Sequence, residues 1–212
     1  MNLNRILILS PHTDDAELGC GGTISKLLEE NKQVHWVVFS IAEDSLPNEK
    51  DKLKLQKEFI KVTEELKLKK DNYTIFRYPV RKLSDYRQEI LESLVKFKKE
   101  FNPELVIGPS LNDFHQDHQV ISNEMIRAFK MHSSILCYEL PWNHINFTST
   151  YFVKLEERHI QKKLNLLRKY ETQVKLNRFY FSEDMVRGLA MTRGAQISHK
   201  YAESFDVIRI VD

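Results

Sequence analysis

Cysteine and long apolar runs are both scarce in this chain of 212 residues. It contains only two cysteines, Cys20 and Cys137. So few thiols argue against a disulfide framework and fit a reducing compartment. The apolar run at residues 5–10 is too short for a membrane span or a signal peptide. We therefore expect a cytoplasmic protein with no membrane span.

Net charge is also small, at +2 from 32 basic and 30 acidic residues. No dense basic block occurs, which argues against nucleic acid as a partner. The lysines concentrate in residues 49–70 and 96–99, where a solvated helix face explains them. Since no repeat, low-complexity segment or linker is visible, we expect one domain over residues 1–212 with one sizeable core.

Short apolar runs alternate with longer amphipathic stretches along the first two thirds of the chain. This pattern predicts strands and helices in turn. Ser84 is expected to cap the helix that carries Ile90 and Leu94 on one face. The expected strands are 6–10, 34–40, 73–76, 105–107 and 135–138, and the expected helices are 19–31, 50–68, 84–100 and 119–131. Such alternation indicates βαβ units, hence an α/β fold with a mainly parallel sheet between two helical layers.

The last third is less regular. We expect a strand at 151–155, a helix at 156–173, a helix around 183–192 and a closing edge strand at 205–211.

A first polar cluster follows the first predicted strand directly. It contains His12, Asp14, Asp15 and Glu17 within six residues. Crowded carboxylates are costly to bury unless they are paired or bind a metal ion. Catalytic zinc sites use imidazole and carboxylate ligands plus water. A solvated loop with acidic residues at a helix start is the alternative interpretation.

A second polar cluster, with His115, Asp117 and His118, follows the fourth predicted strand. It can supply one metal ligand, one free imidazole and a carboxylate that orients an imidazole. A polar surface loop is again the alternative. In a parallel sheet, however, both clusters lie beyond the carboxyl ends of strands, so we expect them to converge on one site.

Other candidate motifs are weaker. Residues 19–23 are glycine-rich but lack the dinucleotide-binding pattern, and close backbone packing explains them better. Ser10 lacks the context of a nucleophile elbow, which favours attack by a metal-activated water. Cys20 and Cys137 are expected to be buried. No ligand pattern joins the five remaining histidines, namely His35, His132, His144, His159 and His199.

The two clusters resemble the motifs of the LmbE-like, or PIG-L, family of zinc-dependent N-acetylglucosamine deacetylases. Pro-His-Thr-Asp-Asp-Ala-Glu at residues 11–17 is similar to the family's opening motif, and residues 115–118 to its His-x-Asp-His motif. The segments 170–173 and 201–205 resemble later family elements, so the resemblance spans nearly the whole chain. It implies a Rossmann-like α/β fold and an N-acetylated sugar as the small-molecule substrate.

The resemblance also implies a role for each residue. His12, Asp15 and His118 would bind Zn²⁺ or another divalent metal. Asp14 would be the general base, and His115 would act at the tetrahedral intermediate with Asp117 orienting an imidazole. Removal of an acetyl group by a zinc-activated water is the function expected. A metal-dependent esterase or phosphoesterase and a non-catalytic sugar- or nucleotide-binding protein are the alternatives.

Thr13 is the one departure from the opening motif, which has proline there. Proline stiffens a turn by fixing φ, so we expect a softer loop with every ligand kept.

The residues that bind substrate are not identified by the sequence. Arg81, Tyr138, Glu139 and Trp142 are candidates for the pocket, where Arg81 would meet an anionic group and Trp142 a sugar ring. Surface exposure and core packing explain them equally well. The sequence is compatible with a homo-oligomer but does not predict one.

Overall fold

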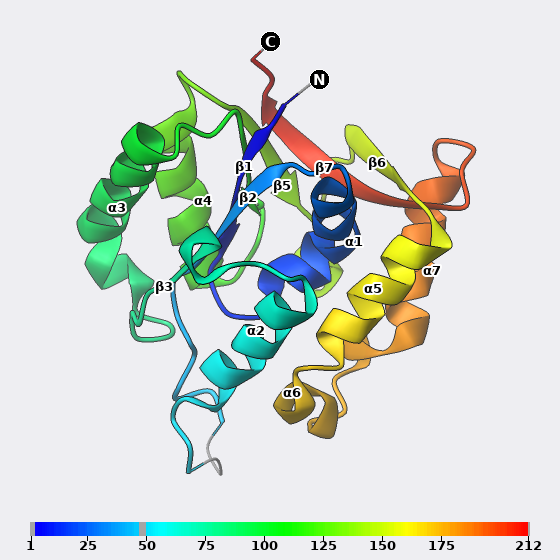
Figure 1. The fold of residues 1–212 in the computed structure, drawn as a ribbon, viewed down its shortest axis with the longest axis horizontal. Coiled ribbons are helices and arrows are strands. Elements are labelled where there is room, and N and C mark those ends of the chain that lie inside the picture. Colours follow the sequence, from blue (N-terminus) through cyan, green and yellow to red (C-terminus); the bar gives the residue numbers. More distant parts are fainter. Residues whose placement is uncertain (1–2, 47–49, 212) are drawn as a thin grey trace.

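A seven-stranded sheet forms the centre of the molecule. The computed structural model describes residues 3–46 and 50–211. Its strands lie in the order β3-β2-β1-β4-β5-β7-β6. Strands β3, β2, β1, β4 and β5 are parallel, whereas β7 is antiparallel to both β5 and β6. The expected α/β fold with a mainly parallel sheet is therefore confirmed (Figure 1).

The strands and helices have the following bounds. The strands are β1 (Arg5–Ser10), β2 (Gln33–Val38), β3 (Tyr73–Ile75), β4 (Leu105–Pro109), β5 (Ser134–Tyr138), β6 (Tyr151–Leu155) and β7 (Tyr201–Arg209). The helices are α1 (Asp15–Glu29), α2 (Lys54–Glu65), α3 (Arg87–Glu100), α4 (Gln116–Phe129), α5 (Glu157–Leu167), α6 (Glu171–Lys175) and α7 (Glu183–Ala195).

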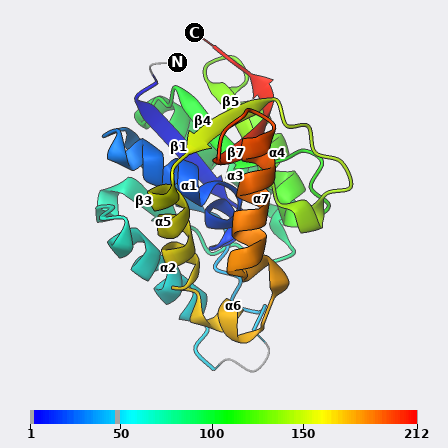
Figure 2. The ribbon, with the colours of Figure 1, turned by 90° about the vertical axis from the view of Figure 1, so that its right-hand side faces the viewer.

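Helices cover both faces of the sheet and bury two hydrophobic clusters. Helices α3 and α4 cover one face, while α1, α2 and α5 to α7 lie on the other (Figure 1). The turned view brings α5, α6 and α7 to the front (Figure 2). Successive residues of β1 alternate between the two clusters, and Ile6 to Leu9 are fully buried. A central parallel strand that is covered on both faces needs this continuous apolar run.

The chain order reverses at β1. Strand β2 pairs with one edge of β1, and β4 pairs with the other. The connections after β1 and β4 therefore diverge and leave a crevice between them at the carboxyl end of the sheet. Both polar clusters of the sequence lie in these two connections.

Two helices begin earlier than the sequence pattern predicted. Helix α1 begins at Asp15 rather than at residue 19, and α4 begins at Gln116 rather than at residue 119. Polar and acidic residues at both starts hid the first helical turn, because they lie outside the apolar repeat. The consequence is that Asp15 and His118 are helical residues rather than loop residues.

Other boundaries also differ. Ser84 does not cap a helix: it lies in a 3₁₀ turn at Leu83–Tyr86, and α3 follows from Arg87. The expected helix at 156–173 breaks near Tyr170 into α5 and α6. The last strand is not an edge strand, because β7 lies between β5 and β6 and leaves β6 at the edge.

None of the helices in the described ranges has the length and apolar character that a membrane span needs.

Candidate active site at the carboxyl end of the sheet

The loop after β1 carries the first polar cluster into the crevice. The main-chain N–H of His12 donates to Asp15 Oδ2 at 2.8 Å, which ties the loop to the first residue of α1. Asp14 is the residue before α1, and its side chain makes no capping hydrogen bond to the helix. Its carboxylate is therefore not used in holding the helix start.

The start of α4 carries the second cluster. His115 caps this helix, because its Nδ1 accepts a hydrogen bond from the Asp117 N–H at 3.2 Å. His118 lies within the first turn and is almost fully buried. The structure thus brings together the two clusters that the sequence separates by about a hundred residues, as the strand topology predicted.

Three donor atoms of these clusters form a small triangle. Asp15 Oδ2 lies 3.2 Å from His12 Nδ1 and 3.2 Å from His118 Nε2. The two imidazole nitrogens are 3.3 Å apart. Ligand atoms about 2.0–2.2 Å from a tetrahedral zinc ion lie roughly 3.3–3.5 Å from one another. The triangle therefore fits a zinc ion in both its spacing and its nitrogen and oxygen donors.

His115 belongs to a wider group around the same point. Nitrogen atoms of His12, His115 and His118 lie within 4.8 Å of one another. The His115 ring stacks on His118, with centroids 4.6 Å apart. Since its Nδ1 already accepts from the helix start and Asp15 lies closer to both other imidazoles, the geometry favours Asp15 as the third ligand and leaves His115 beside it.

Two buried carboxylates contact the ring nitrogens of His12 and His118 that do not face Asp15. Asp117 Oδ2 lies 2.9 Å from His12 Nε2, and Asp113 Oδ2 lies 2.7 Å from His118 Nδ1. Each imidazole therefore directs its other ring nitrogen at Asp15. Asp117, which the resemblance expects to orient an imidazole, thus lies against His12. Asp113 lies beside the second polar cluster in the sequence, but the sequence pattern assigned no role to it.

The electrostatics of the triangle reflect this crowding. Burial lowers the pKa of His12, but Asp15 and the hydrogen bond to Asp117 outweigh it and raise the pKa to about 9. Burial likewise lowers the pKa of His118, yet Asp15 and Asp113 raise it to about 10. Burial raises the pKa of Asp15, but the two imidazoles hold it well below its usual range. A divalent cation would replace the two protons as the partner of Asp15.

Asp14 and His115 have pKa values displaced in opposite directions. Burial and the nearby Asp15 carboxylate raise the pKa of Asp14 to about 6. Burial and the two neighbouring imidazoles lower the pKa of His115 to about 4. At neutral pH, Asp14 is therefore an anion able to accept a proton. His115 is a neutral imidazole, and its Nε2 carries the proton because Nδ1 accepts from the helix start.

A buried tyrosine connects the loop after β1 to the last third of the chain. The Tyr170 hydroxyl lies within hydrogen-bond distance of the Thr13 carbonyl and of Glu17 Oε1. Burial raises the pKa of Glu17 well above its usual range. The phenol has one proton for two acceptors, so a protonated Glu17 completes the network by donating back. Thr13 itself is buried, and its hydroxyl has no hydrogen-bond partner among the described residues.

A cleft of about 540 Å³ opens over the triangle. This volume is within the range of sites for small molecules. The reactive group of a bound molecule would lie at its floor, against His12, Asp14 and His115. Its other lining residues are Thr13, Asp15, Leu18, Ala42, Asp44, Ser45, Leu55, Val80, Arg81, His118, Trp142, Asn143, Gln173, Arg178 and Tyr180.

Two of the four substrate-binding candidates from the sequence line this cleft, and two do not. Arg81 and Trp142 lie in its wall. Tyr138 is fully buried and donates to the Leu9 carbonyl, so it is a packing residue. Glu139 is buried and paired with Arg193. Tyr180, which the sequence did not single out, stacks on Trp142 with ring centroids 4.2 Å apart.

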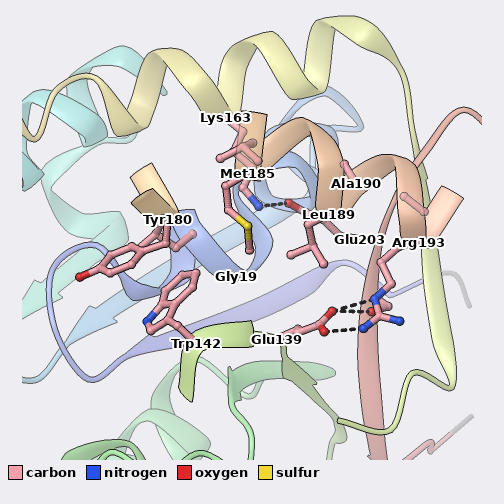
Figure 3. A pocket seen from close by; sticks show the side chains of 14 residues that line it. Gly19, Glu139, Trp142, Lys163, Tyr180, Met185, Leu189, Ala190, Arg193 and Glu203 are labelled. Atoms are coloured by element: carbon pink, nitrogen blue, oxygen red, sulfur yellow. Dashed lines mark hydrogen bonds and ion pairs between the residues drawn. The ribbon is translucent and has the colours of Figure 1, made fainter. Parts of the chain in front are cut away.

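A second, smaller cavity lies behind this aromatic pair. Figure 3 shows Trp142 and Tyr180 at one side of it, the Glu139–Arg193 ion pair at the opposite side and the Lys163–Glu203 pair above. Its volume is only about 20 Å³, enough for a single water molecule. The aromatic pair therefore lies in the wall between the large cleft and this cavity, which is too small to hold a sugar.

Comparison with known proteins places the chain among deacetylases in sequence. The family model described as PIG-L, GlcNAc-PI de-N-acetylase, matches residues 7–129. The uncharacterized deacetylase YaiS of Escherichia coli K12 is 24% identical over 169 residues, which are 79% of this chain and 90% of that protein.

Solved structures share the fold at low sequence identity. The N,N'-diacetylchitobiose deacetylase of Pyrococcus horikoshii superposes with a TM-score of 0.78 at 20% identity, over 98% of this chain and 84% of that chain. The 4-carboxy-2-hydroxymuconate hydratase GalB of Pseudomonas putida KT2440 gives a TM-score of 0.77 at 18% identity, over 99% of each chain. Since that fold also supports a hydratase, the activity must be argued from the site.

Proposed function

Since the chain belongs to the PIG-L family of deacetylases, we propose that it removes the acetyl group from an N-acetylated amino sugar of the N-acetylglucosamine type, with a zinc ion. The observation that carries this proposal is the donor triangle with Asp14 and His115 beside it. The cleft above the triangle has room for a sugar with an attached group. The family description and the chitobiose deacetylase support the amide of an acetylated sugar as the bond that is cleaved.

Zinc is the metal ion that the donor set fits best. We assign His12, Asp15 and His118 as its ligands, because their donor atoms form the 3.2–3.3 Å triangle. Asp117 and Asp113 would keep the two imidazoles in position. When bound, such an ion lowers the pKa of water to about 7 and polarises a carbonyl group.

Asp14 is assigned as the general base. Its carboxylate lies at the floor of the cleft, is free of helix capping and has a pKa raised to about 6. A base with this pKa is ionised at neutral pH and can accept a proton from the attacking water. It can then deliver the proton to the departing amine.

His115 is assigned as the donor to the developing oxyanion. It is neutral, and its Nε2–H is left free because Nδ1 is used in capping α4. Because the helix start fixes this neutral imidazole, its N–H needs little reorganisation to stabilise the negative charge that develops on the acetyl oxygen. Asp117 acts through His12 and is a positioning residue.

An acetate-release assay over N-acetylated sugars, sugar phosphates and glycosides tests the proposal. Zinc-loaded protein is expected to release acetate from at least one compound, and chelated protein is not. Metal analysis runs in parallel, because two ions about 3.5–4 Å apart would favour a phosphoesterase instead. Binding of an acetylated sugar without acetate release by the zinc-loaded protein would contradict the deacetylase assignment.

A further inference from the structure

Two arginines in the cleft form no direct ion pair with a carboxylate in the described ranges 3–46 and 50–211, although Arg178 lowers the pKa of Asp14 and Arg81 lowers that of Asp44. Arg81 and Arg178 both line the cleft, and no ion pair is formed by either guanidinium there. Arginines outside the cleft do form ion pairs: Arg87 and Arg187 lie 2.6 and 2.7 Å from carboxylate oxygens. Asp44, an exposed carboxylate of the same cleft, already forms an ion pair with Lys52 at 2.8 Å. The cleft therefore presents two cationic groups that remain available to a ligand.

Arg81 is attached to the metal site through its own main chain. Its N–H donates to Asp117 Oδ2 at 2.6 Å, and the Leu83 N–H donates to the other oxygen at 3.2 Å. The same carboxylate contacts His12. Arg81 has φ of 66°, a left-handed conformation that is costly for a residue with a side chain. Such conformations persist where the surrounding structure enforces them, and they cluster at functional sites.

Arg178 is held by the aromatic wall of the cleft. Its guanidinium donates to the Tyr180 hydroxyl and lies 5.8 Å from the centre of that ring. Tyr180 in turn stacks on Trp142, with an angle of 15° between the rings. Arg178 comes from the segment after α6, whereas Arg81 comes from the segment after β3. The two guanidinium groups therefore reach one cleft from separate, structured parts of the chain.

We propose that the N-acetylated substrate carries an oxyanion, a phosphate or a carboxylate, which Arg81 and Arg178 bind while the acetamido group lies at the donor triangle. A guanidinium group can form two parallel hydrogen bonds to either anion. This inference rests on the proposed deacetylase function and makes the two arginines determinants of specificity. Neutral acetylated sugars would then be poor substrates, because they leave both cations without a partner.

Matched substrates test the inference. We would measure kcat/KM for N-acetylglucosamine, its 1-phosphate and 6-phosphate, and N-acetylmuramic acid, which carries a carboxylate. The wild-type protein should prefer one of the anionic compounds to the neutral sugar by about tenfold or more, since hydrogen bonds to charged groups are worth ~1.5–3 kcal/mol. Comparison of the phosphates with the carboxylate identifies the anion.

Variants with matched controls separate recognition from structure. Arg81→Gly suits the left-handed backbone, and Arg178→Gln keeps the side-chain length. Each should lower kcat/KM for the preferred anionic substrate by about 10- to 100-fold, with the neutral sugar changed by less than about threefold. Lys82→Gln and Lys175→Gln remove one positive charge nearby, outside the cleft lining, and should leave the preference unchanged.

A binding measurement keeps the inference separate from the proposed function. Calorimetry on metal-free protein should show tighter binding of glucosamine 6-phosphate, glucosamine 1-phosphate or muramic acid than of glucosamine, and Arg81→Gly should abolish that difference. Equal dissociation constants and equal kcat/KM for neutral and anionic compounds would overturn the inference. An equal loss on both substrate classes in the variants would also overturn it. Absence of acetate release from every compound, with the binding preference intact, would contradict only the deacetylase function.

Discussion

At the scale of single residues, the proposed metal site depends on carboxylates that touch no substrate. Asp113 accepts the His115 N–H at 2.8 Å and contacts His118 Nδ1 at 2.7 Å, so one side chain fixes both histidines. The sequence identified His115 and His118 by their residue types and spacing. It gave Asp113 no role, because only the folded loop turns that carboxylate towards an imidazole five residues later.

Asp113→Asn is expected to weaken zinc binding by about 10- to 100-fold, because an amide no longer stabilises the proton on His118 Nδ1 as a carboxylate does. Competition with a fluorescent chelator measures the affinity. Asp85→Asn, which changes an exposed carboxylate in the 3₁₀ turn before α3, is the control and should bind zinc like the wild type. Unchanged affinity in Asp113→Asn would remove its positioning role.

Zinc binding should also release protons. With pKa values raised to about 9 and about 10, His12 and His118 are protonated at pH 7, yet ligand imidazoles must be neutral. Binding at pH 7 is therefore expected to release about two protons, and affinity should rise as pH increases from 7 towards 9. Calorimetry in buffers of different ionisation enthalpy counts these protons. Zinc binding that releases none at pH 7 would contradict the imidazole ligands.

Thr13→Val tests the one irregular position of the opening motif. The buried Thr13 hydroxyl has no hydrogen-bond partner among the described residues, so an apolar side chain of the same shape should stabilise the protein. We expect a gain of about 1 kcal/mol, or a rise of roughly 2–4 °C in the melting temperature, with deacetylation unchanged. A lower melting temperature would show that the hydroxyl has a partner, such as a buried water.

At the scale of elements, α1 is two helical segments joined at Cys20, whose φ of −146° is not helical. Glu203 of β7 accepts from the Gly22 and Thr23 N–H groups and pairs with Lys163 of α5. Close backbone packing was the expected reason for the glycines of residues 19–23. At Gly22 this holds, because an added Cβ atom would lie 2.6 Å from Leu155. The kink itself was not predictable, because its partner Glu203 is about 180 residues away.

Glu203→Gln should destabilise the whole protein, because it leaves the buried Lys163 ammonium without a counter-charge. We expect a loss of about 3–5 kcal/mol, or roughly 10 °C in the melting temperature. The double variant Lys163→Met, Glu203→Gln removes both charges and should lose less. A single variant that melts within about 2 °C of the wild type would show that this pair does not support the kink.

At the scale of the whole molecule, the parallel sheet and the convergence of the two clusters followed from the sequence. They depend on local apolar runs and on a general rule for where sites form in such sheets. The placement of β7 inside the sheet did not follow, because an antiparallel strand at the chain end pairs through contacts that no local pattern records. Trp142 was a candidate for the pocket from the sequence, but its stacking partner Tyr180 was missed for the same reason, since the two residues meet only in the fold.

The central claim is that Asp14 acts as the base beside a metal ion held by His12, Asp15 and His118. The most direct measurement is kcat for acetate release by zinc-loaded Asp14→Asn, with bound zinc determined on the same sample. We predict a loss of about 10²–10⁴-fold in kcat, with zinc still bound in the wild-type amount. A rate close to that of the wild type, with zinc bound, would contradict the account.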